Sequence, residues 1–335
     1  MADPAVLNSF TMLPDLAAER LGGAVIVAND EFFAEKENLL KAAAPVWREG
    51  VYTDRGKWMD GWETRRRREA GFDWCIIRLG LTGVIRGVVV DTAFFTGNYP
   101  ESCSLETVSL AGTPDASALA AAPWKEILPR SPLTGNAQTP FAIDASDRWT
   151  HLRFNIFPDG GVARLRVHGE AIPDWESLLR AGGWIDLAAL ANGGIVVSQS
   201  DAFYGNASNM LQPGRSTHMG DGWETKRRRG AGNDWAVVKL ARPGLVRRVE
   251  IDTDHFKGNA PGWCSLEACI ATDAAIVGSA ATWKQILPRT ALQPHARCAF
   301  EKELTEMDNI THVRLSIYPD GGVARLRLLG SPCPV

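Results

Sequence analysis

Apolar and polar residues alternate along much of the chain, and this alternation predicts β-strands. Leu152, Phe154 and Ile156 alternate with neighbours of a different character, and the stretch 163–167 continues the pattern after the turn sequence Pro-Asp-Gly-Gly. A period of two places successive side chains on opposite faces of a strand. Because Pro and Asp start tight turns and Gly ends them, residues 152–167 predict a β-hairpin.

Other segments of the chain read in the same way, and few of them favour a helix. Helix is predicted only at 35–43 and in a turn at 124–128. Many short strands separated by Gly, Pro and polar turns favour an all-β, antiparallel sandwich over a doubly wound sheet. The further predicted strands lie at 24–28, 75–79, 84–92 and 104–110.

The chain also contains an internal repeat. The phrase Asp-Gly-Trp-Glu-Thr followed by four basic residues begins at Asp60 and returns at Asp221, and the hairpin pattern returns at 313–328. Self-similarity at a constant offset indicates tandem copies of one structural unit. We therefore expect two tandem β-sandwich domains, with a first repeat at 15–169, a linker with a short amphipathic stretch at 170–183, and a second repeat at 184–335.

The two copies differ in length just before the repeated phrase. The first copy carries an insertion within residues 46–59, which includes Trp47, Tyr52 and Trp58. An aromatic insertion at this place predicts either a lid over a pocket or a surface for another copy of the chain.

Composition narrows the class of protein. The 335 residues are 45% hydrophobic and 22% charged with a net charge of -3, which is typical of a globular protein of about two domains. This balance argues against nucleic acid and against an anionic membrane as partners. No apolar run approaches the ~20 residues of a membrane span, and the N-terminus, with Asp3, Pro4 and Asn8, lacks the pattern of a signal peptide. We expect a cytoplasmic protein.

The six cysteines include no Cys-x-x-Cys pair, which argues against a disulfide framework and against a zinc site. Cys103 and Cys264 occupy equivalent positions in the two copies. We expect both to be small buried hydrophobic residues.

Two pairs of arginines form a first set of candidate functional residues. Arg164 and Arg166 lie on the strand face opposite Leu165, and Arg325 and Arg327 repeat them. Two guanidinium groups that project from one strand could hold a carboxylate by bidentate hydrogen bonds. The alternative is a strand face that carries salt bridges.

The repeated phrase supplies candidate acids. Asp60 and Glu63 precede a run of bases, and Asp221 and Glu224 repeat them. In a loop between strands these carboxylates could act as general bases and as acceptors for amide-type N–H groups. The alternative is a structural network in which acids and neighbouring bases neutralise one another. Because acids are interleaved with the bases, residues 65–68 do not indicate a nucleic-acid site.

One difference between the copies suggests a division of roles. Only the second copy places His255, with Asp252 and Asp254 nearby, before the shared Gly-Asn sequence. His255 is a candidate acid or base near neutral pH, and the three residues together are a weaker candidate for a metal site. We expect His151 and His312, which lie within predicted strands, to be structural.

Several long motifs resemble the allantoicase family. They are Lys-Trp-Met-Asp-Gly-Trp-Glu at 57–63, Asp-Trp-Cys-Ile-Ile-Arg-Leu-Gly at 73–80, Phe-Phe-Thr-Gly-Asn-Tyr-Pro at 94–100 and Pro-Asp-Gly-Gly-Val-Ala-Arg at 158–164. The segment 255–259 of the second copy fits the same family, so the resemblance covers both repeats.

The resemblance implies two galactose-binding-like jelly rolls, a homo-oligomer, and hydrolysis of allantoate to ureidoglycolate and urea. Arg164 and Arg166, or their repeats, would then hold the substrate carboxylate. Proton transfer is expected from His255 or Glu224. The remaining candidate site residues are Asp60, Glu63, Asp221 and Asp252 for catalysis and Asn98, Asn259, Lys257, Trp62, Trp223, Arg325 and Arg327 for substrate binding. No cofactor is required by the sequence, and a divalent metal is left open. Two alternatives are a related enzyme that acts on ureidoglycolate and a jelly-roll protein that binds a ligand without catalysis.

Overall fold

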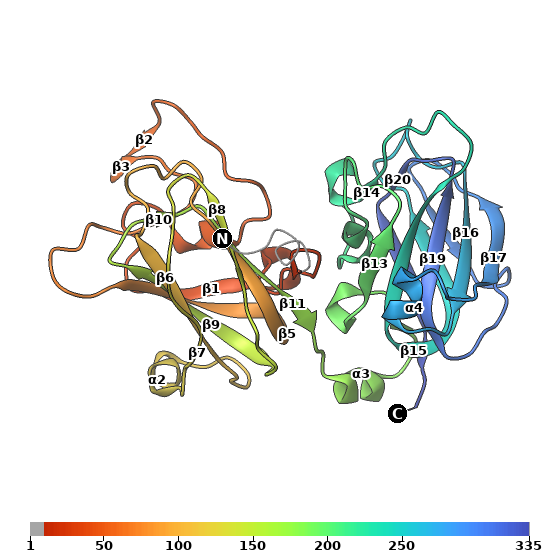
Figure 1. The fold of residues 1–335 in the computed structure, drawn as a ribbon, viewed down its shortest axis with the longest axis horizontal. Coiled ribbons are helices and arrows are strands. Elements are labelled where there is room, and N and C mark those ends of the chain that lie inside the picture. Colours follow the sequence, from red (N-terminus) through yellow and green to blue (C-terminus); the bar gives the residue numbers. More distant parts are fainter. Residues whose placement is uncertain (1–9, 335) are drawn as a thin grey trace. The chain divides into compact units, whose positions relative to one another are not determined.

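The computed structural model describes residues 10–334 and forms two compact units that divide between Ile172 and Pro173. Residues 1–9, which include Asp3, Pro4 and Asn8 of the N-terminal segment discussed above, and Val335 lie outside the described residues. Strands make up most of the regular structure in both units (Figure 1), and the sheets that contain the longer strands are antiparallel. The all-β, antiparallel class is therefore confirmed. Within residues 10–334 no helix is long and apolar enough to cross a membrane.

The first unit is organised around one long strand, β5 (Asp73–Asp91). Its first half pairs with β1 (Ala24–Ala28) and β9 (Trp149–Phe157), and its second half pairs with β8 (Gln138–Ala142) and β11 (Arg164–Ala171). β5 thus contributes to both layers of a sandwich. The first layer continues through β6 (Ser102–Val108) to β7 (Lys125–Pro132), and the other elements of this unit are η1 (Glu19–Leu21), η2 (Lys36–Leu40), β2 (Tyr52–Thr53), β3 (Gly56–Lys57), β4 (Trp62–Glu63), α2 (Ala116–Ala121) and β10 (Gly161–Val162).

The core of the first unit lies between these layers. Ile77 from the first half of β5 and Val88 from the second half are both fully buried in one cluster, together with Phe154 of β9 and Leu165 of β11. Burial of such side chains contributes roughly 1.5–3 kcal/mol each. The period-two pattern that predicted the strands therefore marks the residues that hold the two layers together.

The predicted hairpin at 152–167 is wrong, although both of its strands exist. β9 pairs with β5 and β6, whereas β11 pairs with the other half of β5. The Pro-Asp-Gly-Gly sequence between them packs on distant backbone: Gly161 N–H donates to Asn98 O at 2.7 Å, and a Cβ on Gly161 would lie 1.9 Å from a ring carbon of Phe95. The glycines therefore permit close approach and do not close a hairpin.

Three further predictions need correction. The turn at 124–128 is not helical but begins β7, and the nearby helix is α2, where Asp115 accepts a hydrogen bond from Ala118 N–H. The predicted helix at 35–43 is the shorter 3₁₀ helix η2. The strands predicted at 75–79 and 84–92 are parts of the single strand β5. Tertiary pairing decided these outcomes, because local propensity cannot tell a continuous bent strand from two strands.

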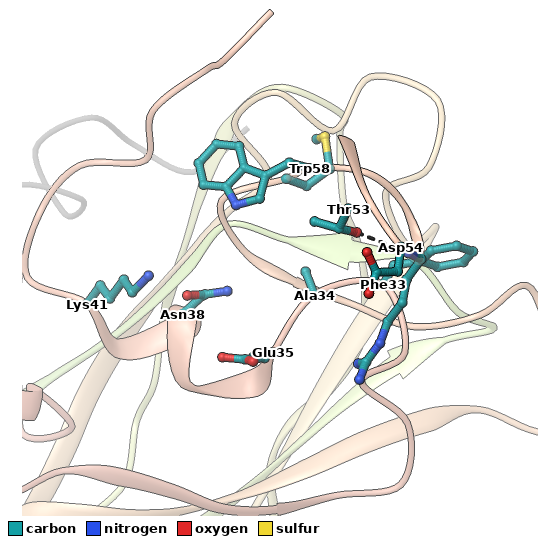
Figure 2. Close-up of a pocket in the computed structure, with 10 residues that line it drawn as sticks. Phe33, Ala34, Glu35, Asn38, Lys41, Thr53, Asp54 and Trp58 are labelled. Carbon is teal, nitrogen blue, oxygen red and sulfur yellow. Dashed lines mark hydrogen bonds between the residues drawn. The ribbon is translucent and has the colours of Figure 1, made fainter. Parts of the chain in front are cut away.

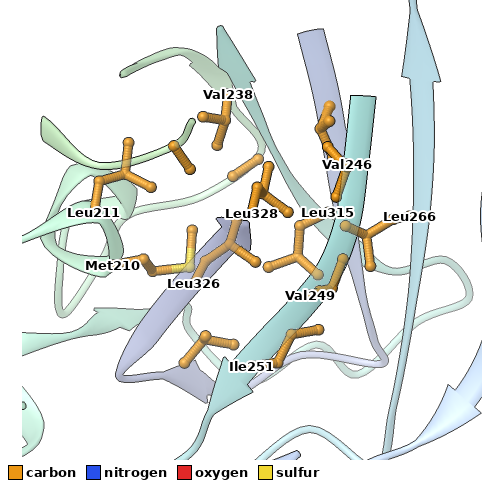
Figure 3. Packing of buried hydrophobic residues seen from close by; sticks show 14 of the residues in the cluster. Met210, Leu211, Val238, Val246, Val249, Ile251, Leu266, Leu315, Leu326 and Leu328 are labelled. Atoms are coloured by element: carbon orange, nitrogen blue, oxygen red, sulfur yellow. The ribbon is translucent and has the colours of Figure 1, made fainter. Parts of the chain in front are cut away.

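The second unit repeats the same plan around β15 (Asp234–Asp252). β15 pairs with β13 (Ile195–Gln199) and β19 (Ile310–Tyr318) through its first half and with β18 (Arg297–Phe300) and β21 (Arg325–Pro332) through its second. Figure 3 shows its core, where Val249 and Leu326 pack with Leu315. The other elements are α3 (Trp175–Ala181), β12 (Ile185–Asp186), η3 (Leu190–Asn192), η4 (Ala207–Leu211), η5 (Met219–Asp221), β14 (Trp223–Glu224), β16 (Trp263–Cys269), α4 (Asp273–Val277), β17 (Lys284–Ala291) and β20 (Gly322–Val323). The amphipathic stretch expected at 175–180 is α3.

Candidate functional site

Asp60 and Arg164, which the sequence places among the site residues, form a buried ion pair. The Arg164 Nη2 group donates to Asp60 Oδ2 at 2.8 Å, with side-chain exposures of 2% and 7%. Arg164 also donates to the backbone carbonyls of Asp60, Ala43 and Ala163. Burial would raise the pKa of Asp60, but hydrogen bonds from Arg164 and Val46 N–H and the nearby positive charges outweigh it and lower the pKa. The guanidinium group of Arg164 is therefore engaged without any ligand.

The second unit contains the same pair. Arg325 Nη2 donates to Asp221 Oδ2 at 2.9 Å, and its Nε donates to Gly214 O. Arg166 and Arg327 are also engaged, the first with the carbonyl of Lys41 and the second with that of Gln212. These four arginines hold the chain that precedes the repeated phrase, which matches the salt-bridge alternative. A carboxylate-binding role for them stays a prediction.

Glu63 and Asn98 are brought together although they are far apart in sequence. Asn98 Nδ2 donates to Glu63 Oε1 at 2.7 Å, and Asn259 Nδ2 donates to Glu224 Oε1 at 2.6 Å in the second unit. β4 holds Glu63 by pairing with β10 on one side and through a bridge to Ala34 on the other. The Gly161 N–H that donates to Asn98 O holds the loop of Asn98 against the same β10. The folded Pro-Asp-Gly-Gly segment thus aligns the glutamate with the asparagine.

Burial raises the pKa of Glu63, and the hydrogen bond from Asn98 offsets this only in part. A glutamate with a raised pKa can exchange a proton closer to neutral pH than an ordinary one. With Oε1 engaged by Asn98, Oε2 is left for a ligand. Glu63 therefore has the properties of a general acid–base group.

Glu63 and Asn98 line an open hollow of about 620 Å³ with the base-rich part of the repeated phrase. We call it the glutamate hollow and define it by Glu63, Arg66, Arg68, Asn98 and Asp159. Basic residues of the phrase alternate in their contacts, since Arg65 pairs with Asp30 and Arg67 with Asp73. Arg66 and Arg68 are exposed and make no hydrogen bond or ion pair with the described part of the chain. These two guanidinium groups are therefore free to bind an anionic ligand. The sequence alone could not show that Arg65 and Arg67 bind acids whereas Arg66 and Arg68 do not.

The two tryptophans of the phrase are core residues. Trp62 and Trp223 are fully buried, and each indole N–H donates to a backbone carbonyl, that of Asp30 or Asp201. They shape the floor on which the phrase lies. Direct contact of either ring with a substrate stays a prediction.

His255 occupies the position that Phe94 has in the first unit. Both residues have a φ of 70°, a conformation that is strained for a residue with a side chain. His255 Nε2 lies 3.0 Å from Ser216 O, and its backbone N–H donates to His295 Nδ1 at 2.8 Å. His255, Lys257 and His295 line a shallow hollow with His218. His218 and His295 were not among the predicted site residues, and neither has a histidine counterpart in the first copy.

Asp252 and Asp254 do not form a metal site with His255. Arg215 pairs with Asp254 at 2.6 Å, and Asp252 Oδ1 accepts the Asp254 N–H. Burial is the main cause of a raised pKa at Asp252. Across residues 10–334, no group of three or more His, Cys, Asp or Glu side chains is arranged to hold a metal ion.

Two of the cysteines and two of the histidines are buried residues away from both hollows. Cys103 and Cys264 are fully buried, and burial raises the pKa of each thiol to about 12. His151 and His312 are also buried, and burial lowers the pKa of each. None of the four lines either hollow.

Comparisons with known proteins agree on one family. The family model described as "Allantoicase repeat" matches residues 14–172 and 185–333. The chain is 51% identical to "Probable allantoicase" of Nocardia farcinica, over 98% of this chain and 97% of that protein, and 48% identical to "Allantoicase" of Dictyostelium discoideum, over 94% and 86%. The crystal structure of allantoicase from Saccharomyces cerevisiae superposes with a TM-score of 0.82 at 34% identity, covering 99% of this chain and 98% of that one. The chain belongs to the allantoicase family.

Proposed function

We propose that this protein is an allantoicase, a hydrolase that cleaves a carbon–nitrogen bond of allantoate to give ureidoglycolate and urea. The glutamate hollow is the catalytic site. The observation that carries this assignment is the Glu–Asn pair, Glu63 with Asn98 and Glu224 with Asn259, beside arginines that have no acidic partner among the described residues.

Allantoate has one carboxylate and two ureido groups on a single carbon, and the hollow offers a partner for each. Arg66 and Arg68 are the cations for the carboxylate, because guanidinium groups bind carboxylates in bidentate geometry. Asp159 and the side-chain oxygen Asn98 Oδ1 are acceptors for ureido N–H groups, which are costly to leave unpaired. The substrate carbon then lies near Glu63.

One glutamate can move the proton that the reaction requires. The ionised Glu63 takes a proton from water as the water oxygen bonds to the substrate carbon. The carbon–nitrogen bond breaks with its electron pair on nitrogen, and the protonated Glu63 returns the proton to that nitrogen as urea leaves. Asn98 holds the carboxyl group in one orientation through both transfers.

Urea release from allantoate tests the assignment. Glu63→Gln and Glu224→Gln separately measure the contribution of each repeat, and the double variant should lose about 10²–10⁴-fold in turnover, the usual effect of general acid–base catalysis. Glu101→Gln is the matched control, because Glu101 lines the same hollow but Gly262 replaces it in the second copy. A folded double variant with full turnover would contradict the mechanism. The same assay with ureidoglycolate as substrate tests the related-enzyme alternative.

We also propose a homo-oligomer in the cytoplasm, as the family resemblance and the sequence lead us to expect. Light scattering on the purified protein tests the oligomeric state, and cell fractionation tests the cytoplasmic location.

A further inference from the structure

The first unit contains a second hollow that the proposed mechanism does not use. It has a volume of about 380 Å³ and lies between η2 and the insertion 46–59. We call it the insertion cavity and define it by Glu35, Asn38, Lys41, Asp54 and Trp58. Figure 2 shows Lys41, Asn38 and Glu35 on one side, Thr53 and Asp54 on the other, and Trp58 above them. Its size lies in the range of small-molecule sites.

The insertion is held in place over this cavity at both ends and at its tip. Arg164 Nε donates to Ala43 O at 3.0 Å, and the Asp60 carboxylate accepts the Val46 N–H at 2.9 Å. At the tip, Arg55 Nη1 donates to Phe32 O, and its guanidinium carbon lies 5.8 Å from the Phe32 ring centroid. The cavity is therefore formed before any ligand binds, which lowers the entropic cost of binding.

The lining combines one cation with several acceptors. Lys41 Nζ forms an ion pair with Asp60 Oδ1 at 4.0 Å, which is too long for a hydrogen bond, so its three N–H groups are left to donate to a ligand in the cavity that Lys41 lines. Asn38 Nδ2 donates to Gly61 O, which leaves the side-chain oxygen Asn38 Oδ1 to accept. Glu35 and Asp54 add exposed carboxylates. A ligand with one carboxylate and several N–H groups matches this set.

We propose that the insertion cavity is a second binding site for a small ureido acid, separate from the glutamate hollow. Lys41 pairs with the carboxylate of the ligand, Asn38 and the two acids accept its N–H groups, and the Trp58 indole covers it. The ligand class rests on the proposed function. The two hollows share only Phe33 among their lining residues, so both can be filled at once.

The second repeat provides an internal reference for this site. Gln212 stands where the first repeat has Lys41, Asn206 stands where it has Glu35, and no insertion follows. The charged residues that would bind the ligand, Lys41, Glu35 and Asp54, are therefore present in the first repeat only. Lys41→Gln introduces the residue that the second repeat has at this position, so we expect the variant to fold.

Equilibrium dialysis with radiolabelled allantoate measures the number of sites. Glu63→Gln/Glu224→Gln serves as the background, because it should slow turnover about 10²–10⁴-fold. Adding Lys41→Gln or Trp58→Ala should lower the allantoate bound per chain by one. Adding Lys57→Gln should leave the number unchanged, because Lys57 lies on the same insertion but contacts the Trp47 ring outside the cavity. In the otherwise unaltered enzyme, Lys41→Gln should keep kcat within about twofold, since Lys41 does not line the glutamate hollow.

Equal binding in all of these variants, with circular dichroism showing that each is folded, would overturn the proposal. A loss of turnover by Lys41→Gln as large as that of the double glutamate variant would also overturn it, because the cavity would then belong to the catalytic site. If the unaltered protein neither releases urea nor binds allantoate, the proposed function fails instead. Urea release with no binding change in the Lys41 variant would leave the proposed function intact and refute only the second site.

Discussion

Asp60 and Arg164 show how the burial of a residue changes the role that its type suggests. The sequence makes Asp60 and Arg164 candidates for catalysis and substrate binding, yet in the structure they are almost fully withdrawn from water and bind each other. A buried ion pair is strongly destabilised when one partner is removed, because the remaining charge is left uncompensated. Their measurable effect should therefore be on stability.

We expect Asp60→Ala to lower the free energy of unfolding by about 3–5 kcal/mol, measured by urea denaturation, whereas the exposed Asp144→Ala should have little effect. The pKa of Asp60 is lowered in the folded protein, so its stabilising effect is present above its ordinary pKa of 3.8 and is lost as the pH falls through the lower folded value. Because Asp60→Ala has no such carboxylate, its free energy of unfolding should fall less steeply than that of the parent as the pH is lowered below 3.8. A stable variant with no turnover would instead support the predicted catalytic role of Asp60.

At the scale of elements, the insertion 46–59 is an addition to a frame that the two repeats share. The same frame appears in the second repeat, where Arg325 binds Gly214 O and Asp221 accepts the Thr217 N–H without an intervening hairpin. In the first repeat β2 and β3 form that hairpin. The fold therefore closes with either length of chain, because the anchors lie at the ends of the segment.

Replacing residues 46–58 by the segment 217–219 should accordingly leave the first unit folded. The graft keeps Met59, which packs with Phe95 and Ala163. Because loop length has a weak effect on stability, we expect one cooperative thermal transition within a few degrees of the parent. The graft should also lose the allantoate site of the insertion cavity. Loss of cooperative unfolding in calorimetry would show that the insertion is part of the core.

At the scale of the whole molecule, each unit has a core of its own. The buried cluster around Val88 belongs to the first unit, and the cluster around Val249 belongs to the second. Trp175 and Leu178 of α3 pack against the second cluster, so the helix in the predicted linker is attached to the second unit. The C-terminal end of α3, which includes the exposed Arg180, makes little contact with that core.

Limited trypsin digestion should cut first after Arg180, whose side chain is 70% exposed. Exposed segments with little burial are the usual sites of proteolytic cleavage. Mass spectrometry should find two fragments that persist, and Arg180→Gln should slow their appearance. Rapid digestion of either fragment would mean that the units do not fold independently.

The sequence by itself determined the all-β class, the repeated plan, the place of the insertion and the family. These features follow from period-two alternation and from self-similarity, which are properties of the chain in one dimension. It also singled out Glu63, Asn98 and their repeats. It could not show that they form pairs, because the contact depends on segments far apart in sequence.

Only the tertiary structure decided which strands pair and which charges remain available. β9 and β11 follow each other along the chain but join different halves of β5, since the glycine segment between them packs on the Asn98 loop. Long-range packing also decides which arginines are exposed. Arg164 is buried because η2 and the residues after it cover its side chain, whereas Arg66 is exposed because nothing in the described first unit covers it. Burial and partner choice are set by long-range packing, which residue type and spacing do not encode.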